Sequence, residues 1–221
     1  MPNIPVVETI LSVNDQLAEQ NRRTLDDAGV LALNVMASPG GGKTTLIGKT
    51  IDALRDDVRI GVIDGDIVPL DLEGFAAQGI PVSLINTGGD CHLDANMVRN
   101  ALPSMDLAAL DLLIIENVGN LVCPAAFKLG SHINVVIASV PEGADKPYKY
   151  PAMFSGADVL LLNKMDFAEY MEYDIEYFRH GIEVLNPGVA FFPVSCRTGE
   201  GLDAWFDWLR ARLAEKAQPG A

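Results

Sequence analysis

The sequence predicts an α/β fold in which a mostly parallel sheet is flanked by helices on both faces. Apolar runs of strand length alternate with stretches whose apolar residues recur at helical spacing, as in parallel sheets with crossover helices. A glycine-rich turn also connects the first of these runs to a helical stretch, in the order strand, turn, helix. The expected strands cover residues 31–36, 58–63, 82–85, 112–116, 133–140, 158–162 and 189–194.

The length and charge of the chain limit its domain organisation and its partners. At 221 residues it is long enough for one α/β domain with a sizeable core, and short for two. We expect a single domain with an N-terminal helix at about 5–28, a core at about 31–215 and a loose tail at 216–221. Thirty acidic and sixteen basic residues give a formal net charge of −14, which argues against nucleic acid or an anionic membrane as the main partner.

The cysteine content and the lack of long apolar runs indicate a cytoplasmic protein. Three cysteines do not make a disulfide framework, and the N-terminus lacks the basic and apolar regions of a secretory signal. No run approaches the roughly 20 apolar residues that span a bilayer. In a reducing cytoplasm, clustered cysteines are metal ligands more often than crosslinks.

A predicted phosphate-binding loop, residues 37–45, connects the first strand to the helix after it. Successive backbone N–H groups of such a loop surround an anion, and glycines let the backbone approach it closely. Lys43 is expected to reach the β- and γ-phosphates, and the Thr44 hydroxyl to bind Mg²⁺. Ala37 replaces the usual first glycine, so a glycine-rich turn without a ligand is the alternative. The expected nucleotide-binding residues here are Pro39, Gly40, Gly41, Gly42, Lys43, Thr44 and Thr45.

Acidic residues follow two of the later strands. Asp66 comes shortly after the second strand, and Glu116 ends the fourth. Carboxyl ends of parallel strands face the ligand crevice of an open sheet, so both carboxylates are expected there, with Glu116 near Mg²⁺ and the γ-phosphate. We expect Lys43, Asp66 and Glu116 to be the catalytic residues. Thr44 and Asp66 are expected to hold Mg²⁺, although a turn selected for its local hydrogen bonds is the alternative at Asp66.

Two cysteines and a histidine stand after the third and fourth strands. Cys91 and His92 precede Asp94, which suits a helix N-cap, and taken alone this pair is an incomplete metal site. Cys123 follows the fourth strand, so three ligands can converge on the crevice side of the sheet. We therefore expect Cys91, His92 and Cys123 to bind a transition metal.

The tetrapeptide Asn-Lys-Met-Asp after the sixth strand predicts that the base is guanine, and hence that the nucleotide is GTP or GDP. The Asp166 carboxylate can accept hydrogen bonds from guanine N1–H and from the exocyclic amine, a pair of donors that adenine does not offer. Asn163 and Lys164 are expected to hold the loop and cover the ring face. After the last strand, Ser195 and Cys196 suit a backbone contact to guanine O6, with Cys196 a small pocket residue and not a metal ligand.

Two further segments complete the chain. Residues 142–151 are predicted to form a polar loop between the fifth and sixth strands, and loops of this length are usually functional or partner-facing. Residues 201–213 are predicted to form an amphipathic closing helix, in which Trp205 and Trp208 face the core.

Several blocks of the sequence resemble the nickel-incorporation GTPases of nickel–iron hydrogenase maturation, the HypB family. The resemblance extends from Asn21-Arg22 to residues 199–205 and so covers almost the whole chain. Its specific blocks are Ser38-Pro-Gly, Asn86-Thr-Gly with Cys91-His92-Leu-Asp-Ala95, Glu116-Asn-Val-Gly-Asn-Leu-Val-Cys-Pro124, and residues 142–151.

This resemblance implies a SIMIBI-type P-loop GTPase that forms a nucleotide- and metal-dependent homodimer. It implies delivery of nickel to a hydrogenase large subunit, together with other hydrogenase maturation proteins. In the family, the positions matching Cys91, His92 and Cys123 form a metal site at the dimer interface, able to hold Ni²⁺ or Zn²⁺. A small residue at the position of Ala37 is common there.

The chain departs from the family pattern in two respects. It lacks the N-terminal cysteine-rich motif or histidine-rich stretch that many members carry, so we do not expect it to store nickel. In the nucleotide-sensing loop after Asp66, Pro69 and Leu72 stand where threonine and then aspartate are usual, with Asp71 adjacent. We expect slow hydrolysis, because this loop is atypical and no arginine finger accompanies the nucleotide motifs.

Three other functions remain open from the sequence. Urease nickel GTPases are related, but their metal motif resembles Cys-Pro-His, and here Ala125 follows Cys123-Pro124. GTP could also be a structural ligand of a non-catalytic metal-binding dimer. An ATP-dependent ligase or kinase on the same fold is disfavoured by Asp166.

Overall fold

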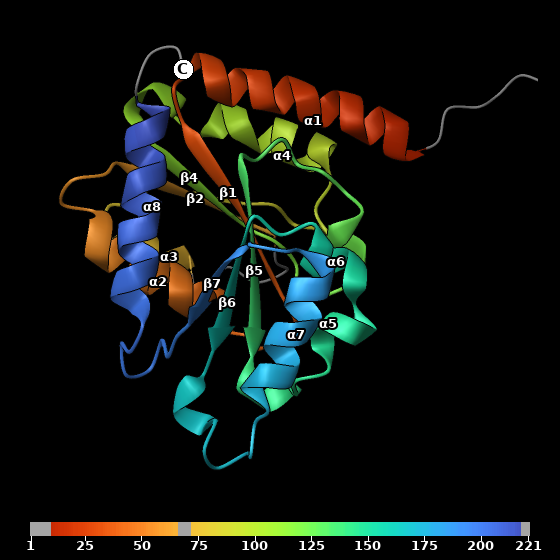
Figure 1. Ribbon diagram of the computed structural model, residues 1–221. Coiled ribbons are helices and arrows are strands. Elements are labelled where there is room, and N and C mark those ends of the chain that lie inside the picture. Colours follow the sequence, from red (N-terminus) through yellow and green to blue (C-terminus); the bar gives the residue numbers. More distant parts are fainter. Residues whose placement is uncertain (1–9, 66–71, 218–221) are drawn as a thin grey trace, which may run out of the picture.

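The computed structural model describes residues 10–65 and 72–217 and contains a seven-stranded sheet in which every pairing is parallel (Figure 1). The strand order is β3-β2-β4-β1-β5-β6-β7, so β1 is central. This sheet confirms the predicted α/β class. The strands are β1 (Leu31–Ala37), β2 (Ile60–Asp64), β3 (Val82–Leu84), β4 (Leu112–Glu116), β5 (Ile133–Ser139), β6 (Val159–Asn163) and β7 (Ala190–Pro193).

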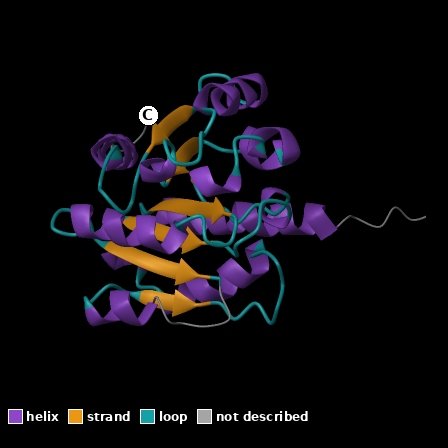
Figure 2. Cartoon of the chain, turned by 90° about the horizontal axis from the view of Figure 1, so that it is seen from below, coloured by secondary structure: helices purple, strands orange, loops and turns teal. Residues whose placement is uncertain are grey.

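Helices cover both faces of this sheet, as Figure 2 shows. One face packs against α2, α3 and α8, and the other against α1, α4, α6 and α7. The α-helices are α1 (Ile10–Asp27), α2 (Lys43–Leu54), α3 (Leu72–Ala77), α4 (Ala95–Ala101), α5 (Lys146–Lys149), α6 (Pro151–Ser155), α7 (Ile175–Leu185) and α8 (Leu202–Lys216). None of the helices in the described ranges is both long and apolar enough to cross a membrane.

The central strands are apolar throughout because both of their faces are covered. All seven residues of β1 are buried, with Leu33 and Val35 facing α2 and Ala32 facing the α1 and α4 side. This burial is typical of parallel strands between two helical layers. Trp205 of α8 also donates a hydrogen bond from Nε1 to Oγ1 of Thr50 at 3.0 Å, which fastens α8 to α2.

Most expected elements are present, with ends that shift by a few residues. The N-terminal helix is described from Ile10 and ends at Asp27, and Gly29 follows it with a φ of +70°, a conformation that favours glycine. The prediction of a polar loop at 142–151 is partly wrong, because this range contains α5 and the start of α6. Pro147 lies in the first turn of α5, where its missing N–H costs no helical hydrogen bond.

Candidate nucleotide and metal site

The phosphate-binding loop lies between the end of β1 at Ala37 and the start of α2 at Lys43. Gly40 and Gly42 have φ values of +72° and +102°, which other residues rarely adopt. A Cβ atom on Gly42 would also overlap Nδ2 of Asn163. Glycine at position 42 is therefore required both by the backbone and by the Asn163 side chain that packs against it.

Two adjoining hollows open around this loop, with volumes of about 460 and 380 Å³. They share the residues Gly40, Gly42 and Thr45. The first is completed by Lys43, Thr44 and Phe75. The second is completed by Pro141, Asn163, Lys164, Asp166, Phe167, Cys196 and Arg197. The arrangement suits a phosphate chain in the first hollow and a base in the second.

The segment after β6 is bonded directly to the phosphate loop. Asn163 donates from Nδ2 to the carbonyl of Gly41 at 3.1 Å, and Lys164 donates from Nζ to the carbonyl of Gly40 at 2.7 Å. The Asn163 Oδ1 accepts from the backbone N–H of Cys196 at 3.1 Å. The predicted role of holding the loop thus has direct contacts, and the bond from Cys196 also joins this segment to the residues after β7.

The Asp166 carboxylate lies at the mouth of the second hollow with both oxygens engaged. Ser195 donates from Oγ to its Oδ1 at 2.7 Å, and Arg197 Nη1 lies 3.3 Å from its Oδ2. Arg197 is 76% exposed and so can move away from an arriving base. Burial raises the pKa of the Cys196 thiol to about 11, so this thiol stays protonated near neutral pH.

Oxygen atoms suited to Mg²⁺ meet where the phosphate loop faces β4. Thr44 donates from Oγ1 to Oε1 of Glu116 at 2.8 Å, and Glu116 pairs in register with Asp64 at the end of β2. Hydroxyl and carboxylate oxygens are the ligands that Mg²⁺ prefers, so this donor set fits that ion. Asp66, which was also expected here, lies outside the described residues. Leu72 begins α3 and is buried in the core.

Cys91, His92 and Cys123 are brought together as expected. Their candidate ligand atoms all lie within 4.8 Å of one another, and Cys91 Sγ lies 2.8 Å from Cys123 Sγ. The hydrogen bond to Cys123 raises the pKa of the Cys91 thiol. The His92 ring packs on Phe127 with centroids 3.9 Å apart, which orients the imidazole. Soft thiolates with an imidazole suit nickel or zinc.

Sequence reasoning missed the groups that support these ligands. Asn117 accepts from the backbone N–H of Leu93 at 3.1 Å, and Asn120 donates from Nδ2 to the carbonyl of Cys91 at 3.1 Å. Both asparagines belong to the block 116–124, on which the family resemblance partly rests. The sequence therefore pointed to their positions, but it did not show their contacts. Phe127 carries no comparable signal.

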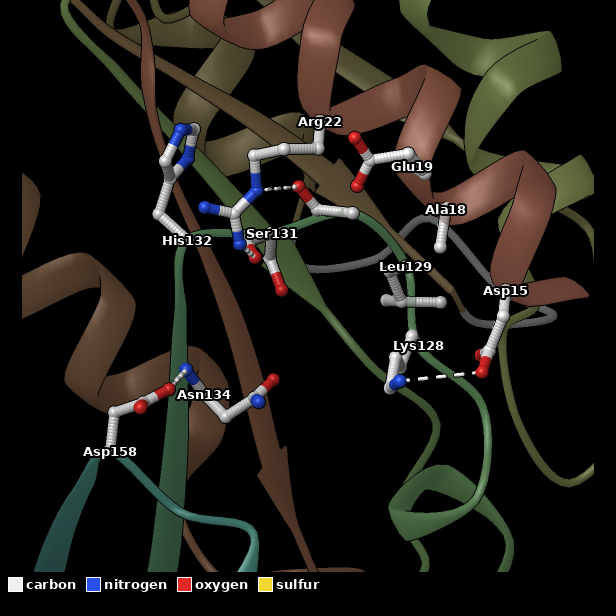
Figure 3. A pocket seen from close by; sticks show the side chains of 11 residues that line it. Asp15, Ala18, Glu19, Arg22, Lys128, Leu129, Ser131, His132, Asn134 and Asp158 are labelled. Atoms are coloured by element: carbon white, nitrogen blue, oxygen red, sulfur yellow. Dashed lines mark hydrogen bonds and ion pairs between the residues drawn. The ribbon is translucent and has the colours of Figure 1, made fainter.

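A further hollow of about 520 Å³ lies between α1 and the start of β5, away from these motifs (Figure 3). Arg22 donates there to two backbone carbonyl groups of the segment before β5, and Lys128 pairs with Asp15 at 3.3 Å. Asp158 accepts from the backbone N–H of Asn134 at 2.7 Å. These charges are already used inside the protein, and we assign no ligand to this hollow.

Comparisons with known proteins agree with one another. A family model described as the CobW/HypB/UreG nucleotide-binding domain matches residues 31–193. The hydrogenase maturation factor HypB of Escherichia coli (strain K12) is 44% identical over 204 residues, which are 92% of this chain and 70% of that protein. The probable hydrogenase maturation factor HypB of Methanocaldococcus jannaschii is 39% identical, and the match covers 96% of this chain and 96% of that protein. The crystal structure of HypB from Helicobacter pylori in complex with nickel matches with a TM-score of 0.88 and 34% identity, over 95% of this chain and 99% of that one.

Proposed function

The chain belongs to the HypB family of hydrogenase maturation factors, and on this premise we propose that it is a GTP-hydrolysing metallochaperone that delivers nickel to a nickel–iron hydrogenase. The observation that carries the proposal is the position of the three metal ligands. Cys123 stands a few residues after Glu116, which is bonded to Thr44 of the phosphate loop, and Cys91 and His92 lie against it. A nucleotide and a metal ion would thus act on one short segment.

In the nucleotide half of the site, each side chain has a distinct task. Asp166 accepts from the guanine donors, while Asn163 and Lys164 fix the base segment on the phosphate loop. Lys43 and the loop N–H groups stabilise the negative charge that develops on the phosphates during hydrolysis. Mg²⁺ held near Thr44 and Glu116 would neutralise further phosphate charge. We propose slow turnover, because no arginine finger accompanies the motifs.

In the metal half, nickel is the cargo and not a resident cofactor. Cys91, His92 and Cys123 supply three ligands from one chain. Two such half-sites facing each other would complete a site in a homodimer, and nucleotide exchange would then change both dimerisation and nickel affinity by a coupling of about 1–3 kcal/mol. The same ligands can take Zn²⁺ in a tetrahedral arrangement, whereas Ni²⁺ with thiolates favours a planar one.

We infer a cytoplasmic site of action, because the cargo is held by free thiols that a reducing compartment preserves. The partners would be other hydrogenase maturation proteins and the hydrogenase large subunit. The rival proposal of a non-catalytic GTP-bound dimer is tested by single-turnover phosphate release, which requires hydrolysis and not binding alone.

The proposed function is tested by nickel titration combined with sedimentation analysis, in GDP and in a non-hydrolysable GTP analogue. Different nickel affinities or oligomeric states under the two nucleotides are expected, and identical values under both would refute the coupling. Cys123→Ala and His92→Ala should each weaken nickel binding while GTP binding persists. His180→Ala is the matched control, because His180 is exposed on α7 away from the cluster.

A further inference from the structure

Residues 116–123, which we call the linker segment, are pressed against the phosphate loop in their middle. The backbone N–H of Asn120 donates to the carbonyl of Ala37, where that loop begins, at 2.9 Å. A Cβ atom on Gly119 would lie only 3.0 Å from Cα of Pro39. The backbone of the linker segment therefore lies directly against the backbone of the phosphate loop, and no side chain separates them at this point.

The side chain of Asn120 holds both cysteine-bearing segments at once. Its Nδ2 donates to the carbonyl of Cys91 at 3.1 Å. Its Oδ1 accepts from the backbone N–H of Val122 at 2.8 Å and so shapes the turn that leads into Cys123. The Asn120 amide thus holds the carbonyl of Cys91 and the backbone of Val122, the residue before Cys123.

We propose that Asn120 is a positioning residue through which the phosphate loop sets the spacing of Cys91 and Cys123. Its backbone is bonded to the loop and its side chain to both ligand segments, so a displacement of the loop by the nucleotide reaches both thiols through this residue. This inference rests on the proposed function and assigns its coupling to one side chain.

Asn117, which directly follows β4, differs from Asn120 in where its bonds go. It also ties the two ligand segments, because its Oδ1 accepts from Leu93 N–H at 3.1 Å. Its Nδ2, however, donates to Oδ1 of Asn34 at 3.0 Å, and its backbone N–H donates to the carbonyl of Val35. Both contacts lie on β1, inside the core and before the phosphate loop. In the described contacts Asn117 therefore supports the site without a bond to the phosphate loop itself.

The spacing of the two thiols can be measured without any metal. Dibromobimane becomes fluorescent when it bridges two nearby thiols, so its rate of bridging in metal-free protein reports the Cys91–Cys123 distance. The rate is compared in GDP and in a non-hydrolysable GTP analogue for the intact protein, Asn120→Ala and Asn120→Ser. Serine can still accept from Val122 N–H but is too short to reach the Cys91 carbonyl. Asn96→Ala is the matched control, since Asn96 is exposed on α4 and bonds only to Arg99 in the described contacts.

We expect the intact protein and Asn96→Ala to bridge at different rates under the two nucleotides. In Asn120→Ala and Asn120→Ser the two rates should become equal, while GTP affinity and thermal stability stay within about twofold and a few degrees of the intact protein. With nickel present, either variant should bind the ion about 10-fold more weakly, as is usual when a group that orients a metal ligand is removed. Thiolate-to-nickel charge-transfer absorption gives the same comparison spectroscopically.

Two results would overturn this inference, and they are distinct. If the Asn120 variants keep the nucleotide dependence of bridging, Asn120 does not carry the coupling, although the proposed function survives. If the intact protein shows no nucleotide dependence of either bridging or nickel affinity, the proposed coupling and the role of Asn120 fail together. If Asn120→Ala does not fold, Asn120→Ser, which preserves the turn, decides between these outcomes.

Discussion

Replacing Asp166 by asparagine should move the base preference from guanine towards xanthine. The carboxylate faces the second hollow with 12% of its side chain exposed, and both of its oxygens accept hydrogen bonds. Guanine offers two donors, N1–H and the exocyclic amine, that two carboxylate oxygens can accept. An amide keeps one acceptor and places an NH₂ group against the other donor. Xanthine carries a carbonyl there, which the NH₂ group can bind.

The size of the effect follows from the bonds that change. A hydrogen bond to a charged group contributes about 1.5–3 kcal/mol, and a facing pair of donors adds a desolvation cost of about 1 kcal/mol. Together these give a loss of about 2.5–4 kcal/mol, which corresponds to roughly 70- to 1,000-fold weaker GTP binding. Xanthosine triphosphate should bind Asp166→Asn more tightly than GTP does.

Competition against a fluorescent guanine nucleotide, with GTP, ATP and xanthosine triphosphate as competitors, measures these affinities. Arg197→Ala is the companion variant: its ion pair with Asp166 is exposed, and such pairs contribute about 1 kcal/mol or less, so GTP affinity should change less than about tenfold. Equal affinity of the intact protein for GTP and ATP, or an Asp166→Asn variant that still prefers GTP to xanthosine triphosphate, would refute the role given to this carboxylate.

Three further predictions concern the phosphate loop and the metal ligands. Lys43→Ala should lower single-turnover GTP hydrolysis by at least about 100-fold with an unchanged circular dichroism spectrum, because Lys43 acts on phosphate charge; a collapsed fold would instead make it structural. Gly42→Ala should weaken GTP and ATP alike, since its φ of +102° adds about 1–2 kcal/mol of strain and its Cβ displaces Asn163; unchanged affinity in equilibrium dialysis would contradict this. Nickel affinity should rise from about pH 6 to about pH 8 in calorimetric titrations, because the pKa of Cys91 is raised and nickel must displace its proton; a flat profile would argue against thiolate ligation.

Local sequence patterns predicted where the strands lie, but they did not predict which strands pair. The seven apolar runs identified the seven strands of the described sheet, because buried parallel strands are apolar throughout. Nothing in those runs indicates that β4 inserts between β1 and β2, because that order depends on pairing between distant segments. Helix α5 was missed since Pro147 and Pro151 were taken as loop residues, whereas each stands in the first turn of a helix.

For the candidate site, the sequence identified the residues with unusual chemistry and not those that hold them. Cys91, His92 and Cys123 could be selected by ligand type and by their places after the third and fourth strands, and the structure brings them together. Asn120 could not, because an asparagine in a loop is usually a turn residue, and only the folded backbone shows that its amide reaches Cys91. The bond between Thr44 and Glu116 likewise depends on how two strand ends meet.

The central place of β1 has a consequence for biosynthesis. Its two partners begin at Leu112 and Ile133, far along the chain, so the strand leaves the ribosome without either neighbour. Such late pairing slows folding and leaves apolar strand edges open to chaperones or to aggregation. Residues 163–166, the predicted guanine-binding segment, and the residues after β7 emerge later still. A nascent chain that stops before β7 would therefore carry a phosphate loop without a complete base pocket, and immobilised GTP would retain finished molecules while truncated ones pass through.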